Sequence, residues 1–460
     1  MSATLTEWRG LLRLALPLAA AQAGLQLMGV VDTAVIGRLG ARELGAVGLG
    51  NALFFTVFIA AMGTVMGIDP LTAQAFGAGD PVRARRTLWQ GVWLAIVIGV
   101  FLSVPLVLAP MILTPFGVDP LIIPDATTYT LIRTLALIPM LLFVVLRSYL
   151  QAQSITRPMV ISIALANVFN LIADIYFVFG GAWLPSWTGP LRLMPAFGVA
   201  GAAIVTVMAS LLQLWILFVA VRALRTPGMK ELWRPVPHEF RKAFHIGLPL
   251  GLQMGAEVGI FALVGLLAGR LGPDDLAAHH IALTLAAFTF TVALGIGAAA
   301  SVRVGHAVGA GDRAGTRRAG LVAFTAGSAF MSCGALIFWL FPAQLASLLS
   351  NKPEVILASI PLLAVAAVFQ ISDGTQAVGA GVLRGAADTR YAFVANLLGH
   401  WFIGLPIAIY LGFHLSMGIV GLWWGLCAGL TAVALLLLIR FLRLSARGIA
   451  AVVPVERVTS

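Results

Sequence analysis

Five acidic residues stand in long apolar stretches of this sequence, where an ionised side chain is costly. They are Asp32, Asp69, Asp174, Glu257 and Asp373. Because hydrocarbon disfavours charge so strongly, each of these acids is a candidate functional group. A buried carboxyl group that takes up a proton or a cation loses its net charge, and this chemistry suits the coupling of ion movement to a second ligand.

Asp174 has the strongest support from spacing. Asn167, Asn170 and Asp174 follow one another at positions i, i+3 and i+7, so they share one face of a helix that is otherwise apolar. We expect a carboxylate and amides to converge here on a cation or a proton. The alternative is a set of hydrogen bonds between helices that serves only packing.

The other acids differ in what surrounds them. Asp32 has no charged partner in its own segment, which favours a proton carrier over a structural cap. Glu257 and Asp373 are expected to bind a cation or proton rather than form a buried structural pair. Gly374 should loosen the helix after Asp373 and free backbone carbonyls for a cation. Asp69 precedes a proline and is expected only to reach water or cap a broken turn.

The composition shows which elements must position these residues. Of the 460 residues, 60% are hydrophobic and only 10% are charged, too few to cover a soluble domain. A helix that spans a membrane needs about 20 mostly apolar residues. Breaking the apolar runs at Gly, Pro and charges predicts twelve such helices: 10–36, 44–74, 87–113, 121–149, 158–182, 196–224, 241–270, 276–306, 318–348, 354–384, 390–412 and 417–446.

The distribution of positive charge predicts the orientation of these helices. Most of the 29 Lys and Arg residues fall on one side, which we assign to the cytoplasm together with both termini. The exceptions are Arg38, Arg42, Arg192, Arg270 and Lys352 on the other side and Arg133 within a predicted span. The net charge of +11 therefore indicates contact with lipid headgroups rather than with nucleic acid. Two cysteines, both within apolar runs, provide neither a disulfide framework nor a metal cluster.

The chain contains an internal duplication at an offset of 232 residues. Pro17 matches Pro249, and the Gly77–Asp80 sequence GAGD recurs at Gly309–Asp312. Each half holds six helices, an even number, so the two halves insert in parallel. We predict an all-α membrane protein with an N-lobe (1–224), a cytoplasmic linker (225–240), a C-lobe (241–448) and a cytoplasmic tail (449–460). The two six-helix repeats should surround a central cavity.

The sequence resembles the multidrug and toxic compound extrusion family, and within it the NorM-like branch. The resemblance rests on LALPL and VDTAVIG in the first helix, the paired QAFGAGD and HAVGAGD loops, LAAHHIAL at 276–283, and QISDGTQAVGAGVLRGAADTR at 370–390. It implies a secondary active multidrug efflux transporter that works by alternating access. Cationic or amphipathic organic compounds would leave the cell in exchange for inward sodium ions or protons, without a cofactor.

The resemblance also assigns roles to residues. Glu257 and Asp373 match acids associated with cation binding in the C-lobe of NorM-like proteins, and Asp32 matches an acid that is widespread in the family. Asn170 and Asp174 match an N-lobe pair of the DinF-like branch, with Thr206 as a further ligand. A sodium ion would therefore bind at Glu257 and Asp373, or at Asp32, Asn170 and Asp174. Which lobe couples to the ion, and whether the ion is sodium or a proton, stays open.

Two alternative functions predict different residues in the membrane. A flippase for lipid-linked oligosaccharides, from the same superfamily, should line its cavity with cations, whereas the midspan charges here are acidic. An intramembrane aspartyl enzyme should carry paired catalytic motifs and no full-length duplication. We therefore expect a transporter and not an enzyme, acting as a monomer in the bacterial cytoplasmic (inner) membrane.

Overall fold

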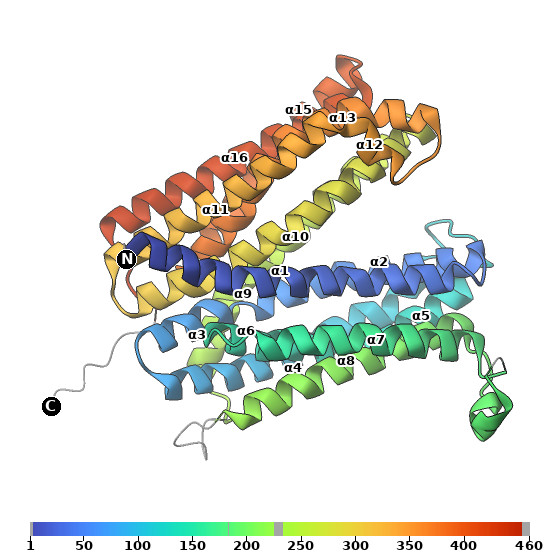
Figure 1. Ribbon diagram of the computed structural model, residues 1–460, viewed down its shortest axis with the longest axis horizontal. Coiled ribbons are helices and arrows are strands. Elements are labelled where there is room, and N and C mark those ends of the chain that lie inside the picture. Colours follow the sequence, from blue (N-terminus) through green and yellow to red (C-terminus); the bar gives the residue numbers. More distant parts are fainter. Residues whose placement is uncertain (1–2, 183, 225–232, 453–460) are drawn as a thin grey trace. The chain divides into compact units, whose positions relative to one another are not determined.

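The computed structural model describes residues 3–182, 184–224 and 233–452, and every regular element within them is a helix (Figure 1). The first half contains α1 (Ala3–Ile36), α2 (Ala41–Val65), α3 (Ile68–Gly77), α4 (Pro81–Leu108), η1 (Ala109–Ile112), α5 (Ile123–Thr134), α6 (Leu137–Ala152), α7 (Arg157–Phe179), η2 (Ser186–Leu193) and α8 (Gly198–Ala223). The second half contains α9 (Pro237–Gly269), α10 (Pro273–Gly309), α11 (Arg313–Leu340), α12 (Pro342–Ser347), α13 (Pro353–Gly385), α14 (Thr389–Leu397), η3 (Leu398–Gly404), α15 (Leu405–Ile409), η4 (Tyr410–His414) and α16 (Gly418–Arg447).

The described helices confirm the expected all-α membrane fold. Eleven described helical stretches are long and apolar enough to cross a membrane, and the number is twelve if α5 and α6, which are bent by 41° relative to one another, count as one span. The predicted spans 44–74, 121–149 and 318–348 are each divided between two helices. The reason is clearest in the last of them. There α11 ends at Leu340 and α12 starts at Pro342, because a proline lacks an N–H and restricts the residue before it.

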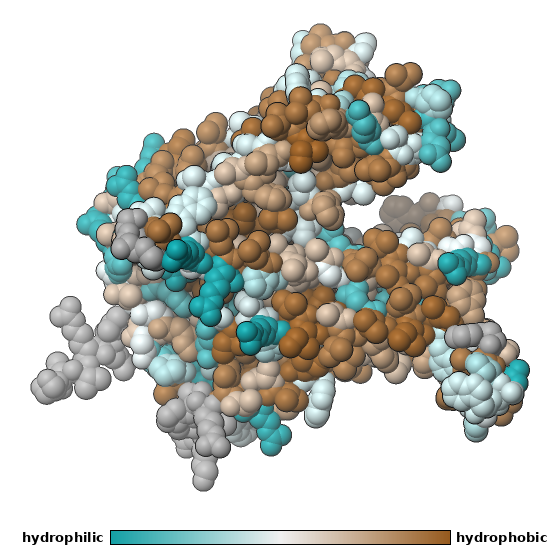
Figure 2. Space-filling view, in the orientation of Figure 1, coloured by the Kyte–Doolittle hydropathy of each residue, from teal (hydrophilic) through white to brown (hydrophobic). Residues whose placement is uncertain are grey.

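Apolar side chains cover much of the surface along the helices (Figure 2). On α4, for example, Val97, Val100, Phe101 and Val104 are all exposed. They follow one another at helical spacing, so they form one outward face. Such a face suits lipid rather than water.

The described residues form two compact units. Unit 1 contains residues 3–22, 69–84 and 246–452, and unit 2 contains 23–68, 85–182, 184–224 and 233–245. Unit 1 therefore combines α3 and the first part of α1 with nearly all helices of the second half. Residues 225–232 of the expected linker and 453–460 of the expected tail lie outside the described residues.

Repeat-related residues of α3 and α10 meet one another in unit 1. A Cβ atom on Gly77 would overlap the carbonyl oxygen of His306, and one on Gly309 would overlap that of Gln74. Gln74 and His306 are related by the same 232-residue offset as Gly77 and Gly309. The contact is therefore reciprocal, as across a local two-fold axis, and both glycines allow the backbones to approach closely.

Candidate functional site

In unit 1, Glu257 of α9 accepts hydrogen bonds from two buried amide side chains. Gln376 Nε2 of α13 and Asn396 Nδ2 of α14 each lie 3.3 Å from Glu257 Oε2. Gln376 and Asn396 are both buried. Two N–H donors on one oxygen are complementary to a carboxylate.

Asp373 lies one helical turn before Gln376 on α13 and is 5% exposed. Its carboxyl group is within electrostatic range of Glu257. Two ionised carboxylates repel one another, so a proton or cation bound at either one relieves the repulsion. The expected loosening of the helix after Asp373 is wrong. Helix α13 continues without interruption, and Gly374 instead makes room for Met331 of α11.

Three buried amide oxygens beside these acids have no hydrogen-bond partner. They are Oε1 of Gln253, Oε1 of Gln376 and Oδ1 of Asn396. Gln253 lies one turn before Glu257 on α9. Because buried oxygens without partners are uncommon, this arrangement favours a ligand, and carboxylates with amide oxygens are the donor set that hard cations prefer. The residues present therefore fit a sodium ion as well as a proton.

The segment after α14 fixes Asn396 relative to α9. Trp401 Nε1 donates a hydrogen bond to the carbonyl oxygen of Ala256, 3.1 Å away, next to Glu257. His400 Nδ1 lies 3.2 Å from the carbonyl oxygen of Asn396. Both rings belong to η3, a π-helical segment, and π-helical turns are frequent at functional sites.

In unit 2, helices α1, α7 and α8 bring Asp32, Asn170, Asp174 and Thr206 together. Thr206 Oγ1 donates to Asp32 Oδ2 at 3.5 Å, and Asp32 and Asn170 both lie beside Asp174. All four side chains are at most 9% exposed. Neither carboxylate oxygen of Asp174 has a hydrogen-bond partner, and the same holds for both amide atoms of Asn170 and for Oδ1 of Asp32. This acid cluster therefore presents several uncommitted polar atoms.

Asn167 does not join the acid cluster through its amide nitrogen. Its Nδ2 donates at 2.9 Å to the carbonyl oxygens of Gly24 on α1 and Ile163 on α7. The three polar residues expected to share one face of α7 therefore have different roles. Asn167 joins two helices by hydrogen bonds, as packing residues in membranes do, while Asn170 and Asp174 face the other acid.

Sequence reasoning assigned no role to Arg133, although it is buried beside the acid cluster. Arg133 lies on α5, is 9% exposed and interacts electrostatically with Asp174. The midspan charges are therefore not all acidic. The only signal in the sequence was a positive charge within a predicted span.

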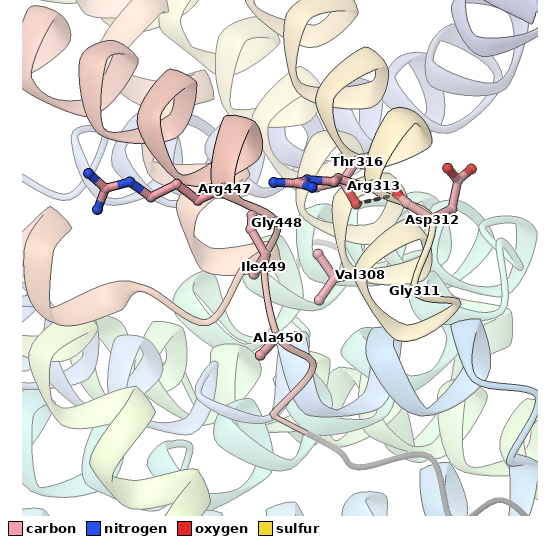
Figure 3. Close-up of a pocket in the computed structure, with 9 residues that line it drawn as sticks. All are labelled: Val308, Gly311, Asp312, Arg313, Thr316, Arg447, Gly448, Ile449 and Ala450. Atoms are coloured by element: carbon pink, nitrogen blue, oxygen red, sulfur yellow. Dashed lines mark hydrogen bonds between the residues drawn. The ribbon is translucent and has the colours of Figure 1, made fainter.

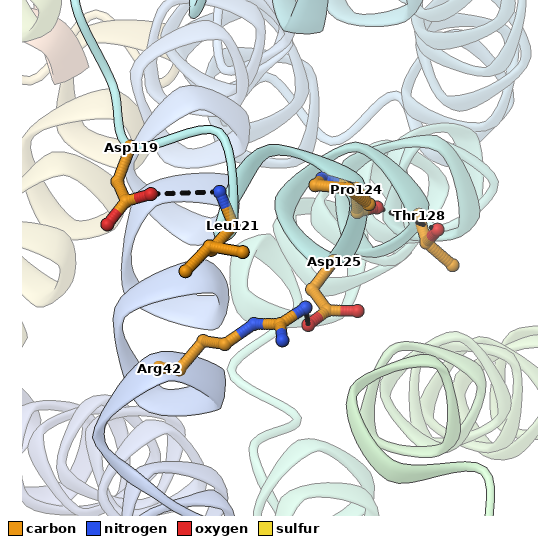
Figure 4. Close-up of polar contacts among 6 residues, drawn as sticks. All are labelled: Arg42, Asp119, Leu121, Pro124, Asp125 and Thr128. Carbon is orange, nitrogen blue, oxygen red and sulfur yellow. Dashed lines mark hydrogen bonds and ion pairs between the residues drawn. The ribbon is translucent and has the colours of Figure 1, made fainter.

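An ion pair joins α2 to the beginning of α5. Arg42 Nη2 of α2 lies 3.2 Å from Asp125 Oδ2, and Thr128 Oγ1 donates to the carbonyl oxygen of Pro124 within α5 (Figure 4). Asp119 accepts from the backbone N–H of Leu121 just before the helix. Both members of the ion pair are substantially exposed, so its contribution is small.

Asp69 lies in the first turn of α3 and belongs to unit 1. Its Oδ2 is 3.7 Å from Nε of Arg384, which also donates to Ser301 Oγ at 3.4 Å. Asp69 and Ser301 are related by the 232-residue offset, so both repeats contact one arginine. Asp69 was expected to reach water or to cap a broken turn, and the structure instead pairs its largely buried side chain with Arg384.

A pocket of about 230 Å³ lies elsewhere in unit 1 (Figure 3). It is lined by the turn between α10 and α11, including Asp312, and by residues that follow α16, with Arg313 and Arg447 as its cationic side chains. None of the six residues expected to couple ions lines it. Glu257 with Asp373 in unit 1, and the acid cluster in unit 2, therefore remain the candidate sites for binding a proton or a cation.

Known proteins resemble this chain along nearly its whole length. The family model described as MatE matches residues 17–176 and 249–410, which confirms the internal repeat. The probable multidrug resistance protein NorM of Rhizobium meliloti is 35% identical over 453 residues, which cover 96% of this chain and 94% of the relative. A protein of the same description from Deinococcus radiodurans is 37% identical, with coverage of 97% and 98%.

Solved structures show the same fold at lower sequence identity. The crystal structure of the eukaryotic MATE transporter AtDTX14 matches with a TM-score of 0.83 and 21% identity, covering 97% of this chain and 98% of that one. The outward-facing conformation of a multidrug resistance MATE family transporter matches with a TM-score of 0.85 and 17% identity, covering 96% of each chain.

Proposed function

Because the chain belongs to the MatE family, and is a multi-pass membrane transporter rather than an enzyme, we propose that it exports organic compounds by antiport against sodium ions or protons. Its relatives carry the description of multidrug resistance protein, and this supports multidrug efflux as its activity. The family match confirms the resemblance drawn from the sequence. In this proposal the transporter carries cationic or amphipathic organic compounds and uses no cofactor.

The observation that carries this proposal is the surroundings of Glu257. Its carboxylate faces two amide donors, a second acid at Asp373 and amide oxygens without partners. A proton or a sodium ion bound here cancels negative charge, and that charge is also what attracts a cationic substrate. The two ligands therefore compete, and competition between them is what antiport requires.

We assign the acid cluster of Asp32, Asn170, Asp174 and Thr206 as a second ion-responsive site. Its buried polar atoms without partners support this assignment. We also propose that the chain consists of the two lobes 1–224 and 241–448 and works as a monomer by alternating access. It also places both termini in the cytoplasm and the chain in a bacterial inner membrane, in agreement with the distribution of Lys and Arg.

Transport in proteoliposomes tests this function. The purified chain is reconstituted, sodium and proton gradients are imposed separately, and movement of a fluorescent organic cation is recorded. Exchange should follow at least one gradient and should be lost in Glu257→Gln and Asp373→Asn. Asp274→Asn is the matched control, because Asp274 is an exposed acid in the first turn of α10. Transport driven by neither gradient, or normal transport by both site variants, would refute the proposal.

The same assay separates the rival flippase function. A flippase for lipid-linked oligosaccharides needs cations for the phosphate groups of its substrate. In unit 2 the buried Arg133 stands beside acids rather than within a group of cations, which favours the antiporter. Movement of a labelled lipid-linked sugar together with no movement of organic cations would support the flippase.

A further inference from the structure

Two loops of unit 2 carry large apolar side chains that no described residue covers. Trp187 and Leu193 of η2 are each 83% exposed, and no residue of η2 is buried. Phe116, which lies between η1 and α5, is 78% exposed. Apolar side chains in water cost free energy in proportion to their area, so a patch of this kind marks an interaction surface.

The loop that contains η2 has a defined fold of its own. The backbone N–H of Gly181 donates to the carbonyl oxygen of Met194 at 2.9 Å, which closes the loop at its base. Tyr176 Oη of α7 donates to the carbonyl oxygen of Leu191 at 2.9 Å. A Cβ atom on Gly181 would overlap that same carbonyl oxygen, so the two sides of the loop lie in close contact. The exposure of its Trp and Leu side chains is therefore a consequence of this fold.

The second loop, residues 109–122, is packed against the helices on its inner side. Leu113 is buried in a small core with Ala46 of α2 and Ala126 of α5. Met111 and Phe116 of the same loop remain exposed. This loop therefore also has an inner face that holds it in place and an outer apolar face without a described partner.

Both loops lie at the same end of unit 2. The first follows α4 and the second follows α7, and between them the chain returns once through the bent pair of α5 and α6. The loop after α7 and the beginning of α5 are accordingly found at one end of this unit (Figure 1). In the orientation proposed above, that end is the outer one.

The exposed apolar surface of the spanning helices leads directly into these loops. Val107 and Leu108 at the end of α4 are exposed, and so are Leu171 and Ile172 on α7. These side chains belong to the surface that faces lipid. Because that surface continues onto both loops at the level where the helices end, the partner that it indicates is the same bilayer.

We propose that η2 and residues 109–122 lie in the headgroup region of one leaflet, the outer one, and attach unit 2 to it. An indole ring with its N–H prefers this region, and Leu and Phe side chains can reach the acyl chains beneath it. Arg192 is the only Lys or Arg in residues 109–122 and 180–197. The attachment therefore depends on apolar insertion, and a zwitterionic lipid suffices.

Quenching of tryptophan fluorescence by brominated lipid tests this proposal without a transport step. The full chain is placed in phosphatidylcholine nanodiscs, and the signal of Trp187 is the difference between the chain and its Trp187→Phe variant, since the chain has 11 Trp residues. Bromines close to the headgroup should remove most of this signal, and bromines near the ends of the acyl chains should remove less. Acrylamide in the water should quench it weakly.

Two further variants calibrate the depth. Trp215 is exposed on α8, so the signal lost in Trp215→Phe gives the response of a ring that faces lipid within a span. Phe116→Trp, made in the Trp187→Phe chain, reports on the second loop and should show the same shallow profile as Trp187. If Trp187→Phe does not fold, Trp187→Tyr takes its place.

Three results would overturn the proposal. Strong quenching of Trp187 by acrylamide with none by brominated lipid would place the loop in water. Protection from both quenchers would mean that a second copy of the chain covers the surface. Quenching by brominated lipid that appears only when anionic lipid is added would mean that charge, and not apolar insertion, holds the loops.

Discussion

Replacing Asn396 by leucine should change the ion dependence of transport by roughly tenfold. Asn396 is fully buried, and its Nδ2 donates to Glu257 Oε2 at 3.3 Å. A hydrogen bond to a charged group contributes about 1.5–3 kcal/mol. This bond is slightly longer than the usual N–H···O range, and Gln376 keeps its own bond to the same oxygen, so the lower figure applies. About 1.5 kcal/mol corresponds to roughly a tenfold change in an equilibrium constant.

The direction of the change identifies the coupling ion. Leucine removes a donor that favours the carboxylate and also removes the free Oδ1 oxygen. If sodium is the coupling ion, half-maximal transport in proteoliposomes should need roughly ten times more sodium, or more. If the ion is a proton, half-maximal transport should occur at a proton concentration roughly ten times lower, because the neutral acid is favoured.

A matched control separates this effect from general damage to the helix bundle. Thr431 Oγ1 of α16 lies 2.7 Å from Ser372 Oγ, beside Asp373 on α13. Thr431→Val removes that contact with little change in volume and should leave the ion dependence unchanged. An unchanged ion dependence in Asn396→Leu, in a variant that still transports, would contradict the role given to this amide.

The remaining predictions concern stability. Gly77→Ala should lower the free energy of unfolding by about 1–3 kcal/mol and so lower the thermal midpoint. Gly48→Ala is the control and should be tolerated, because an added Cβ there has nothing within 4 Å. Equal midpoints for the two variants would contradict the close crossing of α3 and α10. Arg303→Met breaks two hydrogen bonds of 2.8 and 2.7 Å to Glu7 and leaves the Glu7 carboxylate without its partner. It should therefore destabilise the protein more than the double variant that also carries Glu7→Gln. A double-mutant cycle measures this coupling, and additive effects would argue against it. Arg42→Ala should cost less than about 1 kcal/mol in chemical unfolding, and a larger loss would mean that this exposed pair is stronger than its setting indicates.

The number of helices and the duplication could be predicted from the sequence because both depend on local or periodic information. Hydropathy over about 20 residues identifies a span wherever the helix lies in the bundle. The 232-residue offset needs only matching residues such as Pro17 and Pro249, and the two family matches confirm it. The acids were recognisable for the same reason, since an ionisable residue in an apolar run is unusual in itself.

The partners of those acids depended on the tertiary structure. Asn396 and Gln376 are ordinary amides in apolar spans, and only the packing of α9, α13 and α14 brings both onto Glu257. Asn167 and Asn170 share one face of α7, yet one joins helices and the other faces an acid. Helical spacing gives the face of a residue but not the neighbour that this face meets.

Charge balance was the property that the sequence alone left undetermined. Arg133 and the two acids of unit 2 are far apart in the sequence. Arg133 follows Asp32 by about a hundred residues and precedes Asp174 by about forty. Only the folding of α1, α5 and α7 places them within electrostatic range. Electrostatic energy depends on distance in space, so the residues that carry charge were determined by the sequence, and the net charge at each site was decided by the fold.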